Sequence, residues 1–325
     1  MLRILDFMPI TKRIIEDVLG VQSCEQATIV TDLERPATIT TALASCMRHV
    51  GAEVTVVTMS PRDHGGIDPP LPVRGAMWSS QVVILQTSFA MIHTQTLRET
   101  LIRGGRVCEF WGVTEDMMVR GGLTEDPIWL EKTSLRFAKL MDEASEVRIT
   151  TPSGTDLRIY IAGRKAIALA GSARSPGSFC SLPAGESAIA PVEGTVNGKI
   201  VGPYLVEHRE IGRPREPIEL IIREGNVVEV AGGIEAQRLE RLLIESGPSA
   251  RNIAEFAIGT NRRCRVETGL REAKKAWGTV HIGIGDSKSI GGLIESPLHI
   301  DFILLKPTVC LDGQEVVRDG KLLET

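Results

Sequence analysis

A histidine and an aspartate stand two residues apart in a stretch that is otherwise typical of a buried strand. The stretch is SPLHIDFILL, and it contains His299 and Asp301. Residues i and i+2 of a strand point to the same side, so the imidazole and the carboxylate are expected to lie next to each other. Nitrogen and oxygen donors placed in this way can chelate a first-row divalent metal ion. The alternative is a His–Asp hydrogen bond that satisfies two buried polar groups, and the two residues alone favour that alternative.

Three further residues change this balance. His281 lies in the glycine-rich strand GTVHIGIGDS, where glycines allow a close approach to the backbone. Glu255 interrupts the apolar run NIAEFAIGTN, and Glu186 follows the turn in LPAGESAIAP. Each has a simple structural explanation: a strand end, an exposed strand face or a solvated loop. Together they favour a metal site, because a buried charge needs a partner or a metal.

Residues for proton transfer or charge stabilisation are less clearly marked. Lys288 follows the His281 strand, and it either stabilises an oxyanion or is a surface lysine. Glu193 and Asp286 lie within sequence reach of the site as candidate bases. His64, in DHGG, is expected to be structural or to line a cleft.

The order of the predicted elements indicates two different halves. Up to about residue 145, β-branched runs such as EQATIVTD and SSQVVILQTS alternate with helical segments such as TITTALASCMRHVG, a pattern typical of a parallel α/β sheet. From residue 146 a hairpin, EVRITTPSGTDLRIYIAG, begins a series of strands with one clear helix. The proline- and glycine-rich segment 171–185 is predicted to be a loop. We therefore predict an α/β domain over residues 1–147 with a mainly parallel sheet, and an α+β metal-binding catalytic domain over residues 148–325 that is rich in antiparallel strands.

Composition narrows the class of partner. The net charge is −4 and the pI is about 6.0, which argues against nucleic acid or an anionic membrane as a partner. The N-terminal segment lacks the apolar core of a signal peptide, and no stretch approaches a membrane span. The six cysteines are widely spaced without a C-x-x-C pair, as expected for reduced thiols. We predict a cytoplasmic protein that acts on a small molecule or a short peptide.

The segments LPAGE, NIAEFAIGTN, GTVHIGIGDS and SPLHIDF, in this order, resemble the metalloaminopeptidases of the aminopeptidase T and aminopeptidase S type. The resemblance covers most of the second half of the chain and, more weakly, the first half. It implies that two divalent metal ions are held by Glu186, Glu255, His281, His299 and Asp301. We expect Glu186 to be the bridging and catalytic carboxylate. That family also uses a tyrosine after the first histidine, whereas the stretch IGIGDSKSIGG contains none.

The chain also resembles the 2,5-dihydroxypyridine 5,6-dioxygenases, which share this scaffold. The likeness lies in the overall length, in HIDF and in the LDGQEVV that follows it. This resemblance implies a single iron(II). The dioxygenases place a histidine where this chain has Glu255, which favours the aminopeptidase-like set.

Three functional hypotheses follow from these patterns. The preferred one is a metal-dependent aminopeptidase-like hydrolase with one or two zinc, cobalt or manganese ions, in which Glu186 and Lys288 are catalytic. The second is a mononuclear non-haem iron(II) ring-cleaving dioxygenase acting on a dihydroxypyridine-like substrate. The third is a non-catalytic protein that binds a metal or a small molecule. The aminopeptidase resemblance further implies a homodimer.

Overall fold

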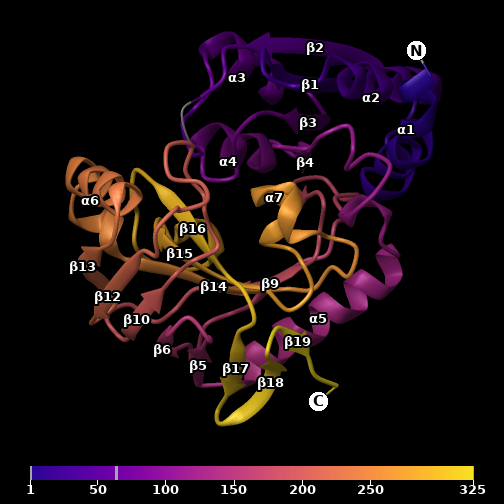
Figure 1. The fold of residues 1–325 in the computed structure, drawn as a ribbon. Coiled ribbons are helices and arrows are strands. Elements are labelled where there is room, and N and C mark those ends of the chain that lie inside the picture. Colours follow the sequence, from indigo (N-terminus) through magenta and orange to yellow (C-terminus); the bar gives the residue numbers. More distant parts are fainter. Residues whose placement is uncertain (1, 63–64, 325) are drawn as a thin grey trace. The chain divides into compact units, whose positions relative to one another are not determined.

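The computed structural model describes residues 2–62 and 65–324, so His64 lies outside the described residues. Contacts within the chain divide it into two compact units. The first comprises Met1–Pro127 and Ala170–Ala184, and the second comprises Ile128–Leu169 and Gly185–Thr325. Each unit is built around its own sheet system (Figure 1).

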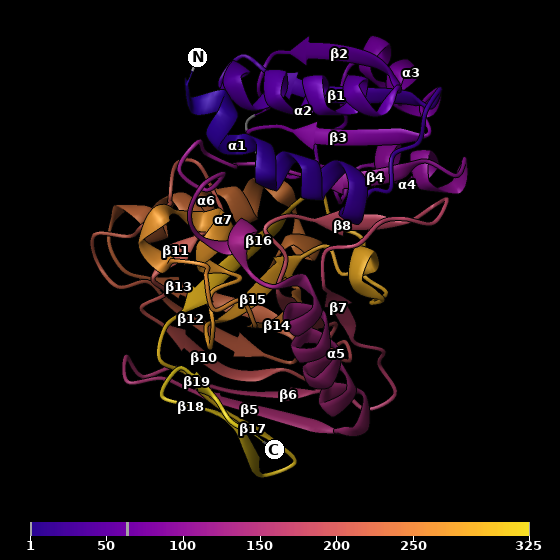
Figure 2. The ribbon, with the colours of Figure 1, turned by 90° about the vertical axis from the view of Figure 1, so that its right-hand side faces the viewer.

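The first unit contains a parallel sheet, as the sequence predicts. Within the described ranges it has five strands in the order β2-β1-β3-β4-β8, and every pairing is parallel. The strands are β1 (Gln26–Asp32), β2 (Glu53–Met59), β3 (Val82–Gln86), β4 (Arg106–Glu109) and β8 (Phe179–Ser181). The helical segments are α1 (Leu2–Lys12), a π-helix (Arg13–Val18), α2 (Ala37–Val50), α3 (Leu71–Trp78), α4 (Gln95–Ile102) and a 3-10 turn (Gly122–Thr124). Helices α1 and α2 pack together and lie in front of the strands in Figure 2.

Strand β8 corrects one prediction. It lies inside segment 171–185, which the proline and glycine content predicts to be a loop. The strand is only three residues long, and it pairs with β4 through the register Val107–Phe179. A strand this short carries no periodic pattern of its own, and its partner is distant in the sequence. Its existence therefore depends on tertiary pairing.

The second unit contains two antiparallel sheets, again as predicted. In the part of the chain that the structure describes, an eight-stranded sheet has the order β13-β12-β10-β6-β5-β17-β18-β19, and a six-stranded sheet has the order β11-β16-β15-β14-β9-β7. The eight strands of the first sheet are β5 (Glu146–Thr150), β6 (Asp156–Tyr160), β10 (Asn197–Val201), β12 (Glu219–Arg223), β13 (Asn226–Ala231), β17 (Thr308–Leu311), β18 (Gln314–Arg318) and β19 (Lys321–Leu322). The six strands of the second are β7 (Ile167–Leu169), β9 (Glu186–Ile189), β11 (Leu205–Val206), β14 (Ile253–Gly259), β15 (Val280–Gly285) and β16 (His299–Leu304). The helical segments are α5 (Pro127–Glu143), α6 (Ile234–Ser246), α7 (Leu270–Ala273) and the 3-10 turns Pro248–Arg251, Val266–Thr268 and Lys288–Ile290.

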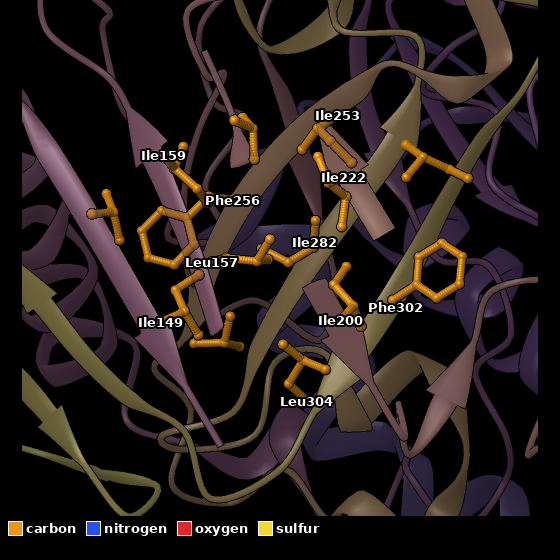
Figure 3. Close-up of a cluster of buried hydrophobic side chains, with 14 of the residues drawn as sticks. Ile149, Leu157, Ile159, Ile200, Ile222, Ile253, Phe256, Ile282, Phe302 and Leu304 are labelled. Atoms are coloured by element: carbon orange, nitrogen blue, oxygen red, sulfur yellow. The ribbon is translucent and has the colours of Figure 1, made fainter. Parts of the chain in front are cut away.

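The hydrophobic core of the second unit lies between these two sheets. Figure 3 shows Leu157 and Ile200 of the eight-stranded sheet with Phe256, Ile282 and Phe302 of the six-stranded sheet. All five side chains are fully buried. Removing this apolar surface from water stabilises the unit by roughly 25 cal/mol per Å² buried. The core therefore holds β14, β15 and β16 rigidly by one face, and their other face is available for polar groups.

The contact units differ from the boundary that the sequence suggests at residues 147/148. Helix α5 belongs almost entirely to the second unit, and segment 170–184 returns to the first. Phe137 and Met141 of α5 are part of the second unit's core, which explains why this helix belongs there. The position of the boundary between independently folding domains stays a prediction.

None of the described helices combines the length and the apolar character that crossing a membrane requires. None of the six cysteines forms a disulfide bond in the described structure, and four of them are buried.

Candidate metal centre

The predicted ligands lie on the face of the six-stranded sheet that points away from the core. Phe256 of β14 and Ile282 of β15 point into the core. Because successive side chains of a strand alternate between its two faces, Glu255 and His281 point to the opposite face, as does Asp301 of β16 by the same alternation. This second face is also covered, since the exposed fractions are 5% for Glu255 and 0% for His281 and Asp301. The sheet therefore presents charged groups to an interior that water does not reach.

The register of the three strands brings these groups together around a glycine. Glu255 lies opposite Gly283, which in turn lies opposite Asp301, and Gly285 lies opposite His299. A Cβ atom added at Gly283 would lie 2.8 Å from the Cβ of Glu255 and 2.9 Å from His299 Nε2. Only glycine leaves this space open. Gly283 in the His281 strand is thus explained by the space that Glu255 and His299 need.

All five predicted ligands meet. His299 Nε2 lies 3.1 Å from Asp301 Oδ1 and 3.1 Å from Glu255 Oε2. His281 Nε2 lies 3.4 Å from Glu255 Oε1 and 3.6 Å from Glu186 Oε2. Among the described residues, two groups have the spacing of metal ligands: Glu186, Glu255 and His281, and Glu255, His299 and Asp301.

Glu255 is the residue that the two groups share. The sequence analysis gives the bridging position to Glu186 instead. The difference follows from strand order, because β14 lies between β9, which carries Glu186, and β15. A carboxylate on the middle strand reaches both sides, whereas Glu186 reaches only one. Glu255 is thus the carboxylate that contacts both groups, and the bridging role of Glu186 stays a prediction.

The ring of His299 is oriented by a backbone carbonyl. Its Nδ1 lies 2.7 Å from the carbonyl oxygen of Asp286. A carbonyl oxygen can only accept a hydrogen bond, so Nδ1 carries a hydrogen and donates it. This arrangement leaves Nε2 directed at the carboxylates of Glu255 and Asp301. It is the outer contact that typically fixes a metal-binding histidine in one tautomer.

The donor atoms fit a divalent metal ion. Within the described part of the chain, neither ring nitrogen of His281 has a well-aligned hydrogen-bond partner, although the ring is fully buried. Buried polar atoms without partners are costly. A cation held by imidazole nitrogen and carboxylate oxygen would give one of these two nitrogens a partner, and that donor set suits zinc, iron, cobalt or manganese.

Sequence reasoning missed three charged residues beside this cluster. Lys274 Nζ forms an ion pair with Asp301 and lies 3.2 Å from Glu207 Oε2. Lys275 Nζ lies 2.5 Å from Glu186 Oε2, and Lys275 is 1% exposed. Both lysines follow α7, in the sequence REAKKAW. Lysine pairs in such polar runs are usually solvated, so the one available signal was their position just before the His281 strand.

Lys288, which the sequence analysis selects as a catalytic candidate, lies in a different environment. Its Nζ is 2.5 Å from Glu295 Oε2, and the two side chains are 51% and 71% exposed. Exposed ion pairs of this kind contribute little. The geometry therefore gives no support to a catalytic role for Lys288, and the ammonium groups next to the cluster belong to Lys274 and Lys275.

The buried charges perturb one another strongly. Burial disfavours the charged forms, yet the ammonium of Lys274 and the imidazoles of His281 and His299 outweigh it and lower the pKa values of Asp301 and Glu255. Burial would lower the pKa of His299, but hydrogen bonds and charge attraction to these carboxylates raise it well above its usual value. Burial, reinforced by Asp301, raises the pKa of Glu207 to about 7 although Lys274 opposes the shift. A metal ion entering the cluster therefore competes with protons on the imidazoles.

Comparison with known proteins separates the two families that the sequence resembles. A model of the family described as NicX, 2,5-dihydroxypyridine 5,6-dioxygenase, matches residues 12–324. The chain belongs to this family. It is 24% identical to the 2,5-dihydroxypyridine 5,6-dioxygenase of Pseudomonas putida KT2440 over 197 residues. That alignment covers 57% of this chain and 56% of the relative, so it spans just over half the length of that enzyme.

Solved structures share the fold of this dioxygenase-family member. The 2,5-dihydroxypyridine dioxygenase of Pseudomonas putida KT2440 has a TM-score of 0.81 at 18% identity and covers 98% of this chain and 97% of its own. Wild-type AmpT of Thermus thermophilus has a TM-score of 0.69 at 16% identity and covers 98% and 99%. The scaffold is thus common to both families. The family match nevertheless favours the dioxygenases over the aminopeptidases that the sequence analysis prefers.

The net charge of the candidate centre in this dioxygenase-family member follows from the described side chains around it. The candidate ligand carboxylates are Glu186, Glu255 and Asp301. Lys275 offsets one of them, and Lys274 is itself offset by Glu207. With neutral imidazoles and an ionised Glu207, two negative charges remain, which one divalent cation balances. A second divalent ion would leave the buried cluster positively charged, at a high cost in a low-dielectric interior.

Replacing Lys274 with methionine is expected to destabilise the metal-free protein. The change leaves the buried carboxylates of Asp301 and Glu207 without their shared cation, and breaking a buried pair in this way costs about 3–5 kcal/mol. Urea unfolding of chelator-treated protein would measure the loss. The control is Lys199→Met, which removes an exposed pair with Glu219 and should cost at most about 1 kcal/mol. Equal losses in the two variants would contradict the expectation.

Proposed function

We propose that this protein is a mononuclear, iron(II)-dependent ring-cleaving dioxygenase that acts on a dihydroxypyridine-like substrate. The family match over residues 12–324 carries the proposal. The donor set supports it, because imidazoles combined with carboxylates are ligands of non-haem iron in oxygenases. In such a reaction a ring carbon–carbon bond breaks, each of its carbons takes one atom of O₂, and the substrate supplies all the electrons. No further reductant is needed.

The residues that would hold the ion are Glu255, His299 and Asp301, and His281 lies beside them against Glu255. When bound, iron(II) would supply the redox activity that O₂ requires and a Lewis-acid position for a substrate oxygen. These four residues come from three adjacent strands fixed by the core. Rigid strands hold ligands more precisely than loops. The backbone carbonyl of Asp286 keeps the His299 ring in the tautomer that leaves Nε2 available.

Other groups of the chain would prepare the site for its substrate. Burial of the cluster excludes water and thereby strengthens each electrostatic interaction within it. The ammonium groups of Lys274 and Lys275 place positive charge beside the centre. A dihydroxypyridine that has lost a hydroxyl proton is an anion, and this charge would favour its binding over that of a neutral ring.

The test is oxygen consumption with 2,5-dihydroxypyridine. Protein loaded anaerobically with iron(II) is expected to bind about one ion per chain and to consume O₂ with this substrate. Removing the iron with a chelator should abolish the uptake, and adding iron(II) back should restore it. Loading with zinc should not, because zinc has no redox chemistry. Absence of O₂ uptake by fully iron-loaded protein would contradict the proposal.

A second candidate is the hydrolase of the sequence analysis. One observation favours it: the two donor groups share Glu255, as ligands of a two-metal centre would. The charge count and the family match both weigh against it. Hydrolysis of leucine amide by protein carrying two zinc, cobalt or manganese ions per chain, without O₂ uptake by the iron form, would make this the better assignment.

A further inference from the structure

The second donor group of the site already contains a cation. Glu186, Glu255 and His281 have the spacing of metal ligands among the described residues, yet Lys275 Nζ lies 2.5 Å from Glu186 Oε2. We propose that the Lys275 ammonium takes the place of a second metal ion beside Glu186 and thereby limits the site to one divalent ion. The inference deepens the proposed function and rests on its single-metal centre. Under this inference, Lys275 determines whether the site binds one metal ion or two.

The position of Lys275 is fixed by its surroundings. Its side chain is 1% exposed and that of Glu186 is 3% exposed. Its backbone N–H donates to the carbonyl of Glu272 at 3.0 Å, and its own carbonyl accepts from the N–H of Asn261 at 3.0 Å. A buried ammonium without a counter-charge is very unfavourable. Lys275 therefore cannot leave Glu186 when a metal ion approaches without losing its own partner.

The charge at this group leaves no place for a second ion. Glu186 is neutralised by Lys275, and Glu255 is shared with the group that contains His299 and Asp301. Once one divalent ion is bound at Glu255, a second would meet a neutral imidazole, a neutralised carboxylate and a fixed positive charge. Repulsion between like charges is strong where water is excluded. The second group is thus complete in its donor atoms but is blocked by its charge.

Lys274 does not act in this way. Its ammonium is paired with Asp301 and lies 3.2 Å from Glu207 Oε2, and these carboxylates offset its charge. It contacts a carboxylate of the group that would hold the single ion. The ammonium in direct contact with Glu186 is that of Lys275, and the two neighbouring lysines therefore have separable roles.

A purely structural salt bridge is the competing explanation. Removing Lys275 would then lower stability but leave the number of bound metal ions unchanged. Under the proposal, the same change frees Glu186, Glu255 and His281 as a second set of ligands. The number of ions bound per chain therefore distinguishes the two explanations, and it can be measured without any assay of activity.

The experiment titrates Mn²⁺ into chelator-treated, full-length protein, and elemental analysis after gel filtration gives the ions retained per chain. The wild type is expected to retain about one, and Lys275→Met about two. Lys199→Met, which removes an exposed lysine, should stay at about one. The double variant Lys275→Met/Glu186→Gln should return to about one, because the freed carboxylate is gone.

Three results would overturn the inference. The first is a folded Lys275→Met variant that still retains one ion, and the second is a wild type that retains two. The third is loss of the single ion in Glu186→Gln, which would make Glu186 a ligand of that ion; if Lys275→Met fails to fold, this variant still tests the premise that Glu186 does not hold the single ion. If the expected counts are found but the iron form consumes no O₂ with 2,5-dihydroxypyridine, the role of Lys275 stands and the dioxygenase function fails.

Discussion

Replacing His299 with alanine is expected to abolish metal binding. The imidazole supplies the donor that two carboxylates surround, since its Nε2 lies 3.1 Å from both Glu255 and Asp301. It is also the ligand that the backbone of Asp286 orients. Losing an outer contact of a metal ligand typically costs about 10–100-fold in affinity, and losing the ligand itself should cost more. Elemental analysis of the purified variant and calorimetric titration with Mn²⁺ would measure the loss.

The matched control for this variant is His49→Ala. His49 lies in the last turn of α2, in the other contact unit, and is exposed. It should keep full metal content and full O₂ uptake with 2,5-dihydroxypyridine. Circular dichroism and thermal melting would establish that both variants fold. A folded His299→Ala protein with an unchanged metal content would show that His299 and Asp301 form only a hydrogen-bonded pair, and the assignment of the centre would be wrong.

Much of the fold could be predicted because local patterns and tertiary packing agree. In β14, β15 and β16 the alternation of apolar and other residues defines both the core face and the polar face. The alternation of strands and helices in the first unit likewise predicts a parallel sheet. Strand β8 and the membership of α5 could not be predicted. A three-residue strand has no period, and the unit to which an amphipathic helix belongs depends on which apolar face lies nearest in space.

The residues of the candidate site likewise fall into those that the sequence could reveal and those that it could not. Glu186, Glu255, His281, His299 and Asp301 could be selected because each is a polar group in an apolar or turn context. Lys274 and Lys275 could not, because a pair of lysines beside glutamate and arginine has the composition of a solvated turn. Their burial depends on the three-dimensional path of the chain after α7 and not on the local composition. Without these two charges the ligand set suggests two metal ions, and this is why sequence reasoning prefers the hydrolase.

Replacing Gly283 with alanine is expected to remove the metal ion while leaving every ligand in the sequence. The added Cβ would lie 2.8 Å from the Cβ of Glu255 and 2.9 Å from both Cε1 and Nε2 of His299. Contacts this short cannot persist, and the Cβ of Glu255 is attached directly to a strand held by the core. The ring of His299 must therefore move away from the donors that it shares with Asp301. We expect a loss of metal affinity of at least about 100-fold, comparable to the removal of a strong supporting contact.

Gly75→Ala is the matched control, because it makes the same chemical change where space is open. Gly75 lies inside α3, and a Cβ added there meets nothing within 4 Å. Alanine in a helix interior is favoured over glycine by about 0.8–1.0 kcal/mol, so this variant should melt at the same or a higher temperature and keep its metal. Mn²⁺ titration and thermal melting of both variants would separate a local effect on the centre from general instability. If Gly283→Ala binds the ion as tightly as the wild type, the ligands do not converge over this glycine, and the metal would have to be held elsewhere on the sheet.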